Sequence, residues 1–208
     1  LADSNGATIT GTCTAGTFHG SGANLTNLPS GGGTTWDSSY KTLKSSEAGN
    51  SNNIQKSILL GEDAGQNMTG GWSVAIGDHA GASTTGNSVC CVGSNAGQNA
   101  TDGCTAIGLY AFTGASSGCT ASRTTCVGQA SGYSISSGGS NTMLGHVAGY
   151  ATTTGYNNVY IGHETGFNGT LANTNVLVGS NIYGPTTGSN LVVLGYNASA
   201  SSNTTTNE

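Results

Sequence analysis

A glycine preceded by an aliphatic residue recurs at short, nearly constant spacing from residue 61 to residue 195. Successive repeat glycines lie 15 to 20 residues apart, most often 16 or 17. The residue before each of them is Leu, Ile or Val. A fixed short period is the signature of repeat architectures, in which each copy is one structural unit stacked on the next. The nine repeat glycines are Gly61, Gly77, Gly93, Gly108, Gly128, Gly145, Gly162, Gly179 and Gly195.

The aliphatic residues are concentrated just before these glycines. From residue 57 onward, 19 of the 24 Leu, Ile and Val residues occupy the four positions preceding a repeat glycine. A short apolar run bounded by turn-forming residues is typical of a buried strand. Each copy therefore predicts one strand of an all-β solenoid with about nine coils, in which every strand pairs with its counterpart in the next coil, about 4.8 Å away.

Each predicted strand has two faces, because successive side chains alternate. The residues one and three before the glycine share the first face, and the residue two before it lies on the second. A strand that is apolar on both faces needs cover on both. One thin solenoid cannot cover its second face, so we expect self-association there. The second face consists of Leu59, Ala75, Cys91, Ala106, Cys126, Met143, Tyr160, Leu177 and Val193.

Composition excludes several functions. Leu, Ile, Val and Phe make up about 16% of the chain, which alone would favour disorder. The net charge of −5 is too small to hold a chain open by self-repulsion. Only four basic residues are present, too few to neutralise a row of phosphates, so no nucleic-acid partner is expected. No apolar run approaches the roughly 20 residues that span a bilayer, so no membrane insertion is expected either.

These patterns divide the chain into four parts. Residues 57–200 form the repeat region, and residues 34–56 form a transition that starts the first coil. We expect residues 1–33 to be a fibre shaft or connector segment and residues 201–208 to be a tail.

Two segments resemble known fibre proteins. Ser73-Val-Ala-Ile-Gly-Asp-His-Ala-Gly81 resembles the head repeat of YadA-like trimeric adhesins, which is also found in viral and bacteriophage tail fibres. Asn24-Leu-Thr-Asn-Leu-Pro29 is similar to an element of viral and phage fibre shafts. The resemblance implies a left-handed parallel β-roll and a homotrimer at the surface of a cell or virion. It also implies a structural and adhesive segment, not an enzyme, that attaches to a cell-surface glycan or cell-wall polymer.

Two other functions fit a solenoid. An ice-binding solenoid needs a regular row of threonines, and Thr152, Thr153 and Thr154 do not recur at one offset. A polysaccharide-degrading tailspike needs a pair of carboxylates about 5 to 9 Å apart. Asp63 and Asp78 occupy near-equivalent positions in adjacent coils, where solvated turns are the simpler interpretation.

Candidate site residues lie mainly at the predicted turns. No catalytic residue, cofactor or metal site is assigned, although His146 and His163 occupy equivalent positions in adjacent coils. Disulfide candidates are Cys104 with Cys119 or Cys90 with Cys104, and Cys13 across chains. Candidate glycosylation sites, each six residues after a repeat glycine, are Asn67, Asn99 and Asn168. Candidate glycan-stacking residues are Trp72, Tyr110, Tyr150 and Tyr156.

Overall fold

The structure, a computed structural model, describes residues 34–37, 42–45, 56–114, 119–184 and 187–199. The connector predicted over residues 1–33, the tail over residues 201–208 and the interchain bridge of Cys13 lie outside the described residues.

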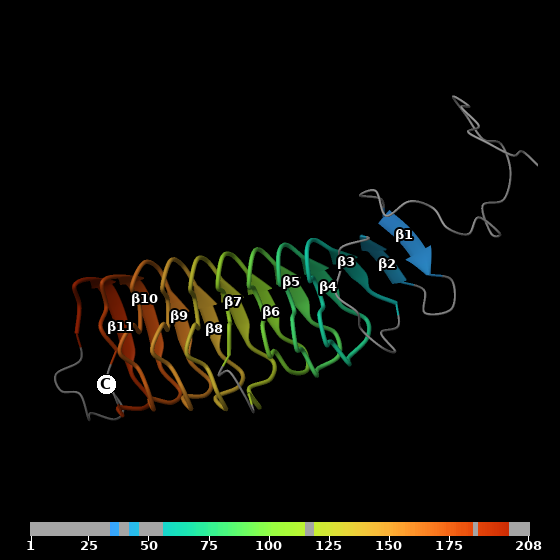
Figure 1. The fold of residues 1–208 in the computed structure, drawn as a ribbon. Helices are drawn as coiled ribbons and strands as arrows, with labels where there is room; N and C mark the ends of the chain where they lie inside the picture. Colours follow the sequence, from blue (N-terminus) through green and yellow to red (C-terminus); the bar gives the residue numbers. More distant parts are fainter. Residues whose placement is uncertain (1–33, 38–41, 46–55, 115–118, 185–186, 200–208) are drawn as a thin grey trace, which may run out of the picture. The chain divides into compact units, whose positions relative to one another are not determined.

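Within the described residues, eleven strands form one sheet whose spatial order is their order in the chain (Figure 1). The first two strands pair antiparallel, and every later pair, from β2 and β3 onward, is parallel. The strands are β1 (Thr34–Asp37), β2 (Thr42–Ser45), β3 (Ile58–Leu60), β4 (Val74–Ile76), β5 (Cys90–Val92), β6 (Thr105–Ile107), β7 (Thr125–Val127), β8 (Thr142–Leu144), β9 (Val159–Ile161), β10 (Val176–Ser180) and β11 (Val192–Tyr196).

The predicted parallel β-solenoid is confirmed. Strands β3–β11 lie where the aliphatic runs placed them, and each pairs in register with its copy in the next coil, as in Leu59 with Ala75. Nine repeat strands leave eight successive turns between them, so the solenoid has about eight turns, not nine. No helix among the described residues is long and apolar enough to span a membrane.

The repeat glycines form a stacked column at the end of these strands. Their φ angles lie between +123° and +150°, a region that side chains rarely adopt. A Cβ atom on Gly77 would lie 2.7 Å from the carbonyl oxygen of Gly93 in the next coil. Both the local backbone and the close approach of the coils therefore require glycine.

The interior of each coil is filled by the residue two before the repeat glycine. All nine of these side chains are buried, with exposures between 0 and 8%. We call them the inner column. The expectation that this second face needs a partner is wrong, because each coil encloses it with the rest of its own chain. Small residues make room for it: a Cβ atom on Gly65 would lie only 2.8 Å from Leu59 Cδ2.

The residues one and three before the repeat glycine point outward instead. We call these two columns of β3–β11 the outer face. Its side chains are half-buried or exposed in all nine strands, with Leu144 45% and Leu194 65% exposed. The face that lacks cover is thus the first face, the opposite of the one expected.

A polar ladder runs inside the coils, four residues before the repeat glycine. Asn158 lies at its centre: its Nδ2 donates to Asn141 Oδ1 (3.1 Å) and to the carbonyl oxygen of Ala172 (2.8 Å). Its Oδ1 accepts the backbone N–H of Asn175 (3.0 Å). Because these buried groups satisfy one another, polar side chains are tolerated inside a narrow core.

The fourth coil departs from the common pattern of the interior. Four residues after the repeat glycine most coils have a glycine, but the fourth has Phe112, which is fully buried. The inner-column residue of this coil is the small Ala106. This coil thus has its large buried side chain after the repeat glycine and a small one before it.

Candidate functional site

The outer face is an uncharged apolar stripe along nine strands. One of its columns is aliphatic throughout, and the other contains only Ile, Val, Cys and Thr. Eight strand spacings give the stripe a length of about 38 Å. A soluble monomer rarely exposes a contiguous apolar patch of more than a few hundred Å². The stripe is therefore a candidate interface for another protein surface.

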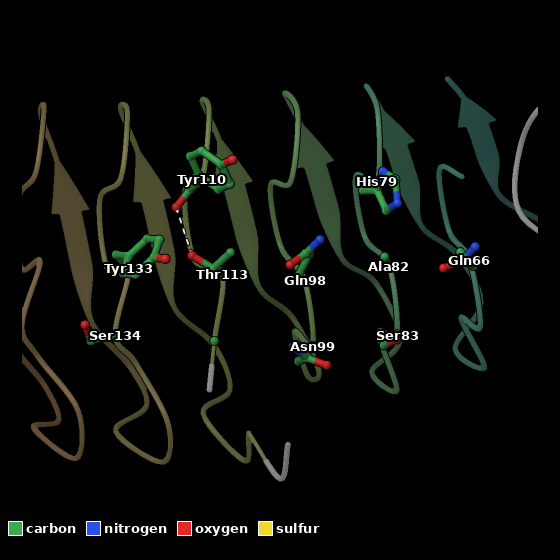
Figure 2. A pocket seen from close by; sticks show the side chains of 11 residues that line it. Gln66, His79, Ala82, Ser83, Gln98, Asn99, Tyr110, Thr113, Tyr133 and Ser134 are labelled. Carbon is green, nitrogen blue, oxygen red and sulfur yellow. Dashed lines mark hydrogen bonds between the residues drawn. The ribbon is translucent and has the colours of Figure 1, made fainter. Parts of the chain in front are cut away.

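A second feature is a hollow of about 700 Å³ that crosses five consecutive coils (Figure 2). We call it the five-coil hollow. Among the described residues that line it there is no Asp, Glu, Lys or Arg, and His79 is the one that contacts carboxylates outside the hollow. Amide, hydroxyl and aromatic side chains without formal charge are the groups that bind neutral sugars through hydrogen bonds and ring contacts. The lining residues are Gln66, His79, Ala82, Ser83, Gln98, Asn99, Tyr110, Thr113, Gly114, Tyr133 and Ser134.

Two tyrosines form an aromatic corner at one end of this hollow. The rings of Tyr110 and Tyr133 meet edge to face, with centroids 6.3 Å apart and planes at 76°. Thr113 Oγ1 donates to the backbone oxygen of Tyr110 (3.2 Å; Figure 2), which ties the corner to the floor of the hollow. Tyr110 is 41% exposed and so remains accessible to a ligand.

The other candidate stacking residues differ in how open their rings are. Tyr150 is sandwiched between Tyr133 (5.1 Å) and Phe167 (5.2 Å), with all planes within 7° of parallel, so a sugar can meet only its edge. Trp72 is 56% exposed, but Lys56 Nζ lies 5.5 Å from its ring centroid and covers one side. Tyr156 is half exposed and has no ring partner among the described residues.

The carboxylates considered for hydrolysis are both engaged by one histidine. His79 Nδ1 lies 2.6 Å from Asp78 Oδ1, and its Nε2 lies 3.6 Å from Asp63 Oδ2. The hydrogen bond to Asp78 raises the pKa of His79 above its ordinary value. This exposed arrangement is an ion-pair cluster rather than an acid and a base that face each other across a substrate.

His146 and His163 do stack, as their equivalent positions predicted. Their ring centroids are 5.2 Å apart and their planes differ by 13°. His163 Nδ1 lies 3.1 Å from Asn181 Oδ1. Within the described part of the chain, no group of three or more His, Cys, Asp or Glu side chains is placed to hold a metal ion.

The intrachain disulfides predicted from the sequence are not formed. Both candidate bridges need Cys104, and its thiol is free and buried. Cys90 and Cys91 are also free, on the outer face and in the inner column respectively. Cys104 belongs to the internal ladder, and its Sγ lies 3.6 Å from the backbone oxygen of Ala121. Cys91 and Cys104 thus serve as small apolar core residues, whereas Cys90 is half-buried on the outer face.

The three candidate glycosylation sites lie at one offset in their coils. Asn67 and Asn168 are exposed, whereas Asn99 is half-buried in the wall of the five-coil hollow. A glycan on Asn99 would therefore occupy the hollow.

Sequence reasoning missed the polar part of the hollow. Gln66 and Gln98 both follow a repeat glycine by five residues, and Tyr133 stands at the same offset four coils after Gln66 and two coils after Gln98. Comparing residues at one offset, rather than looking for aromatic residues alone, would have grouped them.

Comparison with known proteins gives no relative: no family model matches the chain, and no curated protein or solved structure matches it.

Proposed function

We propose that this chain is a structural and adhesive segment of an extracellular or virion fibre. Three copies associate through their outer faces and attach to a cell-surface glycan or cell-wall polymer. The observation that carries this proposal is the uncharged apolar stripe on the outside of the coils. The number of copies follows from the resemblance to trimeric adhesins.

A second copy is the simplest cover for the outer face. The stripe runs along all nine repeat strands with no Asp, Glu, Lys or Arg in it, so it offers a partner no charge to pair with. An identical stripe matches it in length and in the 4.8 Å spacing of its rungs. Such a contact buries the most exposed aliphatic side chains of the outer face, including Leu144, Val192 and Leu194.

Attachment is supported by the five-coil hollow. None of its lining residues belongs to the outer face, so association and ligand binding can occur together. Its amides, hydroxyls and aromatic corner suit a neutral stretch of polysaccharide. Three copies on one particle raise the avidity of a weak site by about 10²- to 10⁴-fold without any new contact.

The attachment is tested by co-sedimentation of the whole chain with insoluble cellulose, chitin and peptidoglycan. We expect binding to at least one of them, weakened by Tyr110→Ala and by Gln98→Ala. Tyr183→Ala is the matched control, because Tyr183 is 51% exposed and lies outside the hollow. The proposal fails if the chain binds none of these polymers, or if the two hollow variants bind as well as the control.

Ice binding is a second candidate because of one specific observation. Thr105, Thr125 and Thr142 stand in register on the outer face of three adjacent strands. That row is interrupted by Cys90 on one side and Val159 on the other. Thermal hysteresis in a solution of the purified chain would favour this function. Ice binding requires an outer face that is open to water rather than covered by other copies.

A further inference from the structure

Arg123 stands at an exposed corner of the solenoid, five residues before a repeat glycine. Its φ is +54°, and its backbone N–H donates to the carbonyl oxygen of Asp102 (2.9 Å). The residues at the same offset in the adjacent coils are Gly103 and Ser140. A Cβ atom on Gly103 would lie 3.8 Å from Arg123 Cγ, so the arginine stem passes over a residue without a side chain. At this corner, therefore, the preceding coil has no side chain at the equivalent position to crowd Arg123.

Among the described residues, no carboxylate forms an ion pair with Arg123. The ion pairs there all involve a histidine. Asp102 lies in the preceding coil, but its carboxylate is directed elsewhere. Its Oδ1 accepts the backbone N–H of Asn87 (2.7 Å) and is 3.5 Å from Asn87 Nδ2. The donors of Arg123 are therefore available to a ligand.

Hollows flank Arg123 on both sides. The one shared with Asp102 measures about 450 Å³. The other measures about 330 Å³ and is lined by no acid. The hydroxyl-bearing residues Thr120, Ser122, Ser137 and Ser140 line this second hollow together with Tyr156, which is 50% exposed. The hydroxyls of Ser122, Ser137 and Ser140 make no hydrogen bond to another described residue.

We propose that the acid-free hollow beside Arg123 binds a carboxylated sugar of an acidic polysaccharide. The planar guanidinium pairs with the carboxylate through two parallel hydrogen bonds, the geometry in which arginine binds this group best. The serine hydroxyls bind the sugar hydroxyls, and the Tyr156 ring packs against the apolar face of the sugar ring. This inference deepens the proposed function, on which it rests, by naming the polymer class recognised at a second site.

The test measures binding of the full chain to polygalacturonate and to its methyl ester, which has the same backbone without the charge. We expect binding to the acid form to exceed binding to the ester by about tenfold or more. Arg123→Gln should remove this preference, and free galacturonate should compete whereas galactose should not. Lys56→Gln is the matched control, because Lys56 is exposed at the same offset and its replacement changes the net charge equally.

The inference is overturned if the natural chain binds both polymers equally, or if Arg123→Gln binds the acid form as well as the natural chain does. It is also overturned if Lys56→Gln loses as much binding to the acid form as Arg123→Gln, which would indicate unspecific charge attraction. Tyr156→Ala is a second test. We expect it to lower the affinity for the acid form, and an unchanged affinity would contradict the site. Failure here is distinguishable from failure of the proposed function, since binding to neutral polymers depends on Tyr110 and Gln98 and not on Arg123.

Discussion

Single glycines hold the coils at their spacing. Each repeat glycine combines a φ between +123° and +150° with, in all but the last one, Gly195, a close carbonyl oxygen of the next coil. A methyl group there would add backbone strain and would also clash with the next coil. The clash could be relieved only if neighbouring coils moved apart and broke their hydrogen bonds. The column of nine glycines is therefore the most restrictive residue requirement in the solenoid.

Gly77→Ala should lower the free energy of unfolding by about 3 kcal/mol or more, from strain at a glycine-only conformation and from the contact with Gly93. Gly103→Ala is the control: its φ is +68° and its nearest non-neighbouring atom would be 3.8 Å away. About 1 kcal/mol is expected there, from the left-handed conformation alone. Equal unfolding midpoints of the two variants in guanidinium would contradict the stacked-glycine account.

The buried asparagines are a second requirement at this scale. Asn158→Ala should cost about 2 to 4 kcal/mol, because it leaves the N–H of Asn175 and the carbonyl oxygen of Ala172 without their partner in the core. Thermal unfolding of this variant is compared with that of Asn168→Ala, where the side chain is exposed and little change is expected. If both variants melt alike, the ladder contributes nothing to stability.

At the scale of the strand and its coil, the sequence predicted the positions of strands β3–β11 to within one or two residues but assigned their faces the wrong way. The alternation of side chains along a strand separates two faces, but it does not show which face a narrow coil encloses. The inner column shares its side with the polar ladder of Ser73, Thr124 and Asn158, so that side looked less like a core. The glycine that six of the nine coils have four residues after the repeat glycine was the available clue, because it makes room for inner-column side chains such as Leu59.

The fourth coil tests how core volume is shared within one unit. Phe112→Ala should destabilise the chain by about 3 to 5 kcal/mol, because Ala106 is too small to fill the cavity. Phe112→Gly together with Ala106→Leu recreates the Leu59 and Gly65 pairing of the first coil. We expect this double variant to recover most of the unfolding free energy. A double variant no more stable than Phe112→Ala would show that the two positions do not share one space.

The vicinal cysteines report which face of a strand is enclosed. Burial raises the pKa of Cys91 to about 12, so its thiol stays protonated, and it should resist maleimide even at pH 9. Cys90, on the outer face, should react whenever that face is uncovered. Labelling in a Cys13→Ser background, with the sites identified by peptide mass, checks this prediction. Native labelling of Cys91 in preference to Cys90 would reverse the assignment of faces.

At the scale of the whole molecule, the period was enough to predict a parallel solenoid, because its strands, glycines and polar returns recur together. The sites were less accessible to sequence reasoning. Tyr110 lies in the five-coil hollow and meets Tyr133 edge to face, whereas both faces of Tyr150 are stacked on neighbouring rings, and no spacing rule separates the two. The hollow is assembled from residues 66 to 134, each of which looks ordinary in its own coil.

The central claim is that the outer face of the coils is covered by further copies of the chain, and native mass in solution tests it most directly. We predict that the natural sequence has a native mass of three chains, that of a homotrimer, at micromolar concentration. Leu144→Lys, which places a charge in the middle of the outer face, should give a folded monomer with a reactive Cys90. Gln129→Lys, with the same charge change at an exposed position outside that face, should stay trimeric. A natural chain that remains a stable monomer or dimer would contradict the account.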